Sequence, residues 1–140
     1  MVVVSRDPGF EAALAGMRLT TVLNDDPTQG ISRSIRLGLD ALPEPAEAAL
    51  IGVADQPNLD AAAIRALRLA FRPGRIVAPR YDDHRGNPVI FDRRFFGELI
   101  VLEGDRGGQL IVEQHPEDVI DVSLPRAVGD DVDRPDEWRG

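Results

Sequence analysis

The residues with the clearest chemical potential follow an apolar run. Residues 49–57 read Ala-Leu-Ile-Gly-Val-Ala-Asp-Gln-Pro, so the run stops at Asp55, with Pro57 two positions later. A continuous apolar segment predicts a strand buried on both faces, and α/β proteins place ligands and catalytic groups at the carboxyl ends of such strands. A carboxylate at that place favours a divalent cation that carries phosphates. A helix or turn cap is the alternative.

Four further segments combine turn residues with polar side chains. Residues 30–34 open a predicted helix whose free amides, hydroxyls and arginines would suit an anion or a nucleobase, or which Ser32 caps. The segments 85–88 and 104–108 contain glycines that let a ligand approach the backbone, or they form an ordinary turn and a helix stop. Residues 130–135 place three carboxylates before a proline, as solvated capping groups or as cation ligands.

Strand and helix signals alternate along the chain. The predicted strands cover residues 2–5, 19–24, 48–54, 75–79, 88–91 and 119–124. The predicted helices cover residues 9–14, 31–42, 61–69, 93–102 and 108–113, with a further helix beginning at Pro135. This alternation predicts an α/β domain with a mostly parallel sheet and helices on both faces, and we expect a single domain over residues 1–140.

Composition narrows the function classes. The 140 residues carry a net charge of −8, which argues against a nucleic-acid surface, and have a mean hydropathy of −0.17, as expected of a soluble domain. No signal peptide or membrane-length apolar run is present, so we expect a cytoplasmic protein. The absence of cysteine excludes disulfides and thiolate metal sites. All 16 basic residues are arginine, which excludes a phosphate-binding lysine.

Taken in chain order, the five segments resemble the molybdenum cofactor cytidylyltransferase family and its wider group of MobA-like nucleotidyltransferases, from Val2 to Trp138. Residues 30–38 look like the family's base-contacting segment, and residues 55–57 look like its metal-binding acid motif. Residues 85–91 and 104–108 look like its pterin-side loops. Residues 131–136 look like its second acid motif, with arginine at position 134 where threonine is usual.

The resemblance implies a reaction and a set of roles. The expected reaction transfers CMP, or another NMP, from a nucleoside triphosphate such as CTP to a molybdopterin-type phosphate acceptor. Asp55 and Asp133 would be the catalytic acids and would bind Mg²⁺ or Mn²⁺, with Asp131 as the alternative to Asp133. The resemblance assigns the other contacts as nucleotide-side residues Gly30 and Ser34, and acceptor-side residues Arg85, Asn87 and Asp105.

The chain also departs from the family pattern. The family begins with a strand and a glycine-rich phosphate loop, whereas this sequence starts at what resembles the second strand, near Val2. The missing strand would lie in mid-sheet beside the strand that ends at Asp55, and its absence would leave two unpaired edges. We therefore expect a homo-oligomer, or a partner chain that completes the sheet. A catalytically inactive nucleotide- or pterin-binding module, or a helper subunit, is the alternative function.

Overall fold

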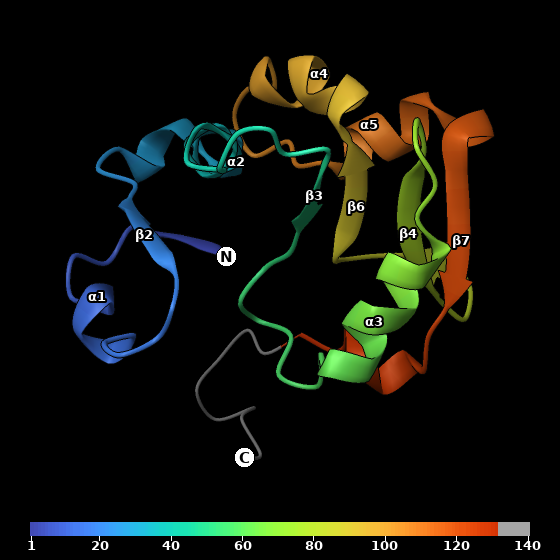
Figure 1. The fold of residues 1–140 in the computed structure, drawn as a ribbon, viewed down its shortest axis with the longest axis horizontal. Coiled ribbons are helices and arrows are strands. Elements are labelled where there is room, and N and C mark those ends of the chain that lie inside the picture. Colours follow the sequence, from blue (N-terminus) through green and yellow to red (C-terminus); the bar gives the residue numbers. More distant parts are fainter. Residues whose placement is uncertain (132–140) are drawn as a thin grey trace.

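The computed structural model describes residues 1–131 and contains two sheets (Figure 1). Strands β1 (Val2–Ser5) and β2 (Thr20–Leu23) form a parallel pair. The five-stranded sheet contains β3 (Ala48–Ile51), β4 (Ile76–Tyr81), β5 (His84–Arg85), β6 (Val89–Asp92) and β7 (Val119–Ser123). Each strand that the sequence predicts is present, and the short strand β5 is an addition.

The five-stranded sheet is mixed, not mostly parallel as the sequence predicted. Strand β6 lies between β3 and β4 and runs antiparallel to both, whereas β7 pairs with β4 in parallel. The cause is the short connection through residues 82–88 between β4 and β6. A parallel connection needs a crossover of a dozen or more residues, so a loop of this length returns the chain in the opposite direction.

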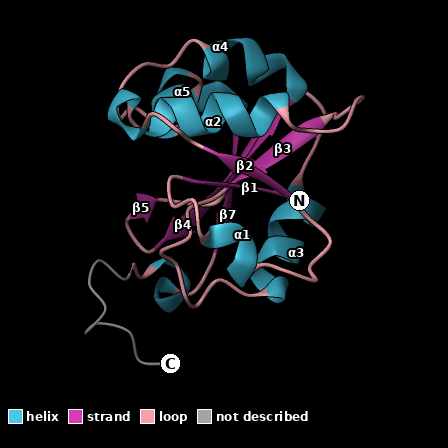
Figure 2. Ribbon diagram, turned by 90° about the vertical axis from the view of Figure 1, so that its left-hand side faces the viewer, coloured by secondary structure: helices cyan, strands magenta, loops and turns pink. Residues whose placement is uncertain are grey.

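Helices cover both faces, as predicted (Figure 2). On one face lie α2 (Ile31–Asp40), α4 (Phe96–Ile100) and α5 (Gln109–Gln114). On the other lie α1 (Phe10–Ala13) and α3 (Ala61–Ala70). Four 3-10 turns complete the described chain: η1 (Pro27–Gln29), η2 (Arg93–Phe95), η3 (Pro116–Asp118) and η4 (Arg126–Gly129). No helix within residues 1–131 is both long and apolar enough to cross a membrane.

Two apolar layers hold the helices on the five-stranded sheet. On the α4 and α5 side, Phe91 packs with Phe95 and Leu99 in the larger cluster. On the α3 side, Leu67 packs with Val77 and the central strand β6. The predicted cap of α3 is confirmed, because the Asp60 carboxylate accepts a hydrogen bond of 2.8 Å from the Ala63 amide.

The two sheets do not pair with each other. Among residues 1–131, strand β1 pairs only with β2, and β3 pairs only with β6, so each presents an edge with no partner in that part of the chain. The prediction that the apolar run before Asp55 forms a strand buried on both faces is wrong, and the strand near Val2 is not buried either. The β1 residues are half-buried, Leu50 is 39% exposed, and β3 ends at Ile51.

Candidate functional site

Most of the candidate residues lie in segments that follow the carboxyl ends of the parallel strands or precede the antiparallel strand β6, whereas Ser34 lies in α2 and Asp105 lies between α4 and α5. The segment 24–30 follows β2, the segment 52–56 follows β3, the loop 82–88 joins β4 to β6, and Asp131 comes after β7. Because parallel strands end at the same edge of a sheet, this connectivity brings polar loops to one edge of the domain. Asp133 lies outside the described residues.

The loop after β3 holds two oxygen atoms with unusual surroundings. Asp55 is half-buried, and its Oδ1 atom is buried without a hydrogen-bond partner among the described residues. Gln56 is 8% exposed, and its Oε1 atom is likewise buried and unpartnered within the described chain. The cap of the following helix is Asp60, so Asp55 does not serve as that cap. Buried polar atoms normally have partners, and hard oxygen donors of this kind suit a divalent cation.

The loop that carries Asn87 is attached to the Asp55–Gln56 loop. The side-chain Nε2 of Gln56 donates a 3.0 Å hydrogen bond to the Asn87 carbonyl. The Tyr81 hydroxyl donates a 2.6 Å hydrogen bond to that same carbonyl. The side-chain amide of Asn87 has no hydrogen-bond partner within residues 1–131, so its polar atoms remain available to a ligand.

The carboxylate of Asp131, in the second acidic segment, affects the ionisation of Tyr81. Burial raises the pKa of the Tyr81 phenol, and the carboxylate of Asp131 raises that pKa further. Asp131, the alternative to Asp133, thus acts electrostatically on the residue whose hydroxyl donates to the Asn87 carbonyl.

Gly30 and Asp105, which belong to two different predicted segments, lie against each other. Gly30 has a φ of +81°, and an added Cβ would lie 2.3 Å from the Gly104 carbonyl carbon and oxygen and 2.7 Å from Asp105 Oδ1. The Ser32 amide donates a 3.1 Å hydrogen bond to the Gly104 carbonyl. No side chain caps α2, so the predicted alternative of a Ser32 cap is wrong. The start of α2 is instead closed by the 104–105 loop.

Ser34 belongs to a network centred on Asn24, a residue that the sequence analysis did not select. The Asn24 side-chain nitrogen donates to the Ser34 hydroxyl at 3.0 Å, while its oxygen accepts from the Asp26 amide and from Arg33 Nε, both at 3.1 Å. Asn24 is almost completely buried at the end of β2. The available signal was an asparagine directly after an apolar strand and before the turn residues Asp-Asp-Pro.

Arg85 has a carboxylate partner that sequence reasoning did not identify. Its Nε and Nη2 atoms donate to the two carboxylate oxygens of Asp121 at 2.7 and 3.0 Å. This bidentate pairing lowers the pKa of Asp121 and raises that of Arg85. Arg85 therefore links β5 to β7. Because Asp121 neutralises its charge, Arg85 would attract an anionic ligand less strongly than an unpaired arginine.

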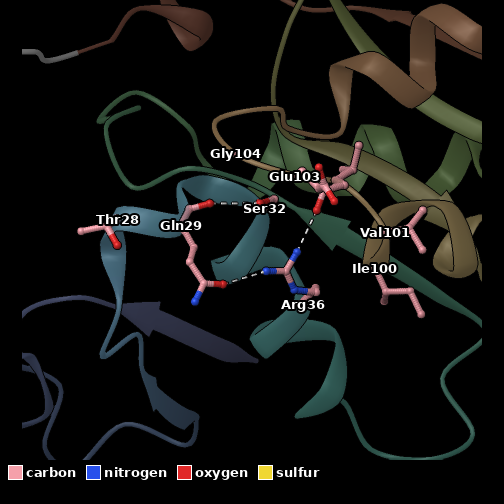
Figure 3. Close-up of a pocket in the computed structure, with 9 residues that line it drawn as sticks. Thr28, Gln29, Ser32, Arg36, Ile100, Val101, Glu103 and Gly104 are labelled. Carbon is pink, nitrogen blue, oxygen red and sulfur yellow. Dashed lines mark hydrogen bonds between the residues drawn. The ribbon is translucent and has the colours of Figure 1, made fainter.

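A groove of about 630 Å³ lies beside Gly30, between the start of α2 and residues 100–104 (Figure 3). Arg36 points into it and donates to the Leu102 carbonyl at 2.7 Å and to Gln29 Oε1 at 3.3 Å. Neither acceptor is charged, and Arg36 has no carboxylate partner in the described part of the chain. Ile100 and Val101, which are 44% and 71% exposed, supply an apolar wall.

The loops around the groove and around Asp55 are connected. The side chain of Gln109, at the start of α5, donates a 3.0 Å hydrogen bond to the Gly86 carbonyl. Gln109 closely follows Gly104 and Asp105, which contact Gly30, while Gly86 immediately precedes Asn87. A continuous series of contacts therefore runs from the nucleotide-side candidates to the metal-side candidates.

A second group of potential metal ligands does not have the character of a cation site. His115, Glu117 and Asp118 place ligand atoms within 4.8 Å of one another, and no other such group of three was found in residues 1–131. Arg94 already forms an ion pair of 2.7 Å with Asp118, and His115 contacts Glu98 at 2.8 Å. Other side chains of the protein thus already engage two of these three residues, His115 and Asp118.

A mixed sheet with helices on both faces and polar loops at the strand ends defines an α/β domain, a class in which ligands commonly bind at the strand-end edge of the sheet. Within that class, the chain belongs to the MobA-like NTP transferase domain family, whose profile matches residues 1–119. The family supports a nucleotidyltransferase-like role and implies a nucleotide substrate. Comparison with curated protein sequences gives no significant match.

Solved structures agree with this assignment. The chain is 27% identical to Rv0371c from Mycobacterium tuberculosis H37Rv, with a TM-score of 0.76 over 96% of this chain and 70% of that chain. A structure of Rv0371c in complex with manganese is also 27% identical, with a TM-score of 0.75 over 96% and 71% of the respective chains. Aq1419 from Aquifex aeolicus VF5, at 11% identity, gives a TM-score of 0.71 over 95% and 70%, which shows the shared fold alone.

We expect Gly30→Ala to destabilise the protein by about 1–3 kcal/mol, because the backbone conformation at position 30 is nearly exclusive to glycine and the added methyl overlaps the Gly104 carbonyl. Urea unfolding measures the change. Gly97→Ala is the matched control, since Gly97 lies in α4 and no heavy atom lies within 4 Å of its Cβ position. Equal stability of the two variants would contradict the close approach of residues 30 and 104.

We expect the Arg85–Asp121 pair to make stability depend on acid pH. The pKa of Asp121 is lower in the folded protein than its ordinary 3.8, so the stabilisation is complete above that value and is lost as pH falls through the folded pKa. Because both side chains are partly exposed, the effect is at most about 1 kcal/mol. Urea unfolding between about pH 5 and pH 3 should give a shallower slope for Asp121→Asn than for the wild type. The exposed Asp40→Asn should keep the wild-type slope, and parallel slopes for all three proteins would refute the pair's contribution.

Proposed function

We propose that this domain binds a nucleoside triphosphate together with a divalent cation, and that it transfers CMP, or another NMP, from that nucleotide to a molybdopterin-type phosphate acceptor. The observation that carries the proposal is the buried, unpartnered Oδ1 of Asp55, at the strand-end edge of a MobA-like domain. In the reaction, an acceptor phosphate oxygen forms a bond to the α-phosphorus while the bond to the leaving pyrophosphate breaks.

The cation is proposed to be Mg²⁺ or Mn²⁺, held by Asp55 together with Asp133 or Asp131. Carboxylate oxygens are the donors that both ions prefer, and the related Rv0371c has been crystallised with manganese. When bound, the ion would supply charge neutralisation for the triphosphate. Two carboxylates leave most coordination positions to water and phosphate, so we expect weak binding in the absence of nucleotide.

The remaining roles follow the arrangement of the loops. We assign Gly30 and Ser34 to the nucleotide side, where the buried Asn24 holds the Ser34 hydroxyl in place. Asn87 and Asp105 are assigned to the acceptor side, as is Arg85, whose ion pair with Asp121 leaves it a secondary role. The groove beside Gly30, with the unneutralised Arg36, would hold an anionic part of a substrate.

An inactive binding module or a helper subunit is the second candidate function, and the sheet edges favour it. Strands β1 and β3 each have an unpaired edge, and the chain has no lysine to stabilise charge on a triphosphate. Loss of one such group commonly costs about 10²–10³ in rate. A second copy or a partner chain that adds a strand between these edges would complete the sheet and could supply groups that stabilise charge on a triphosphate.

We also propose that residues 1–140 form a single domain.

We expect Mn²⁺ to bind the wild-type chain weakly and Asp55→Asn to weaken that binding at least about tenfold, which corresponds to about 1.4 kcal/mol. The amide substitution removes the charge that attracts the cation but keeps the size of the side chain. Water-proton relaxation during a Mn²⁺ titration measures the affinity, with Asp133→Asn and Asp131→Asn identifying the second acid. Asp40→Asn is the control, since Asp40 lies at the exposed end of α2. Identical curves for Asp55→Asn and the wild type would remove Asp55 from the site.

We expect the purified chain to form a dimer or a larger species at micromolar concentration. Unpaired strand edges are templates for pairing with another chain, and a two-stranded sheet is marginal by itself. Light scattering measures the mass. A single species at the chain mass of 15.3 kDa with a cooperative melt would show that the edges do not drive association.

A further inference from the structure

Tyr81 occupies the point where three loops of the candidate site meet. It is the last residue of β4 and is 1% exposed. An added Cβ at Gly86 would lie 2.8 Å from its ring, and one at Gly129 would lie 2.7 Å from it. Two segments of backbone therefore approach the same Cδ2–Cε2 edge of the phenol, and neither position can hold a side chain without displacement. Gly86 directly precedes Asn87, and Gly129 lies two residues before Asp131.

The hydroxyl of Tyr81 connects these loops to the third. It donates to the Asn87 carbonyl at 2.6 Å, and the same carbonyl accepts a 3.0 Å hydrogen bond from Gln56 Nε2. Gln56 immediately follows Asp55, so the orientation of the Asp55 loop depends on where this carbonyl stands. Two donors on one carbonyl fix its direction more firmly than one donor can.

The protonation state of Tyr81 suits this role. Burial raises the pKa of the phenol above its ordinary value of 10.0, and the neighbouring Gln56 amide lowers it by a smaller amount. The hydroxyl therefore stays protonated around neutral pH and donates continuously. It acts as a fixed donor and not as a proton-transfer group.

The buried oxygens of Asp55 and Gln56 give this anchoring a consequence. Both Oδ1 of Asp55 and Oε1 of Gln56 lack a partner within residues 1–131, which is costly for a loop that could turn toward water. Gln56 Nε2 donates to the Asn87 carbonyl. A flip of the Gln56 amide would place Oε1 against that carbonyl oxygen, and two acceptors cannot form a hydrogen bond. The contacts through Tyr81 hold the Asp55 loop in a conformation in which these two oxygen atoms remain available to coordinate a ligand.

We propose that Tyr81 is a positioning residue, which through the Asn87 carbonyl and Gln56 holds Asp55 in the geometry that binds the cation. This inference rests on the proposed function, because it assumes a cation at Asp55. Tyr81 itself touches neither the cation nor the substrate in this account. Groups that orient metal ligands typically change metal affinity by about 10–100-fold when they are removed.

The direct test is Tyr81→Phe, which deletes the hydroxyl and leaves the ring in contact with Gly86 and Gly129. We expect the folded variant to bind Mn²⁺ at least about tenfold more weakly than the wild type in a water-proton relaxation titration. Thr21→Val is the matched control, because it removes a hydroxyl that donates to Glu11 at 3.1 Å on β2, outside the site. Circular dichroism establishes that each variant folds. A purely structural tyrosine would leave the Mn²⁺ affinity of the folded variant unchanged, and that result would overturn the inference.

Gln56→Met gives a second route that does not touch the tyrosine. It removes the donor to the Asn87 carbonyl at similar side-chain length, and it removes Oε1 with it. If Tyr81→Phe does not fold, an unchanged Mn²⁺ affinity of Gln56→Met still overturns the inference, since the anchor is then lost without effect. Because both residues act on one carbonyl, we expect the double variant to lose about as much affinity as the weaker-binding single variant. Affinity losses that multiply would show independent effects and would contradict the shared anchor.

The outcomes separate this inference from the proposed function. If Asp55→Asn binds Mn²⁺ as the wild type does, the proposed cation site fails, and the inference fails with it. If Asp55→Asn weakens binding while Tyr81→Phe and Gln56→Met do not, the cation site stands and only the positioning role is lost.

Discussion

Helix α2 determines how the two halves of this domain are arranged. It packs on β1, where Val4 lies 3.5 Å from the Cβ position of Gly38, and it also packs on α4 above the five-stranded sheet. A two-stranded sheet is marginal in isolation, so β1 and β2 depend on this helix for their place. The Gly104 carbonyl closes the start of α2, which fixes the nucleotide-side segment against the 104–105 loop. A change in the position of α2 would therefore alter the position of the β1–β2 pair and the contact between the start of α2 and the 104–105 loop.

Backbone carbonyls satisfy most of the polar contacts between the loops at the strand ends. The carbonyls of Gly86, Asn87 and Gly104 accept hydrogen bonds from Gln109, from Gln56 and Tyr81, and from Ser32. These main-chain acceptors connect the loops, while Oδ1 of Asp55 and Oε1 of Gln56 have no hydrogen-bond partner among residues 1–131. Natural proteins rarely leave buried oxygens in that state without a ligand or ordered water. The backbone polar groups on one edge of β1 and of β3 also have no partner strand among residues 1–131.

Much of the fold could be predicted from the sequence, because strong apolar periodicity marks its strands and longer helices. The five polar segments could be located for the same reason, as each interrupts that periodicity with turn residues. The direction of β6 was predicted wrongly, since the length of the loop before it, rather than any residue type, decides it. The contacts of Arg85 with Asp121 and of Tyr81 with Asn87 and Gly129 join residues that only the folded topology brings together. No local pattern announces such pairs, so their partners came from the structure alone.

The central claim is that the Asp55 edge binds a nucleotide together with a divalent cation, and calorimetric titration of CTP tests it most directly. The account predicts that the wild-type protein binds CTP in the presence of Mn²⁺, and that binding is lost when the metal is chelated or when Asp55 is replaced by asparagine. Other nucleoside triphosphates in the same titration would identify the preferred base. Binding of equal affinity with and without Mn²⁺, or in the wild type and Asp55→Asn alike, would contradict the account.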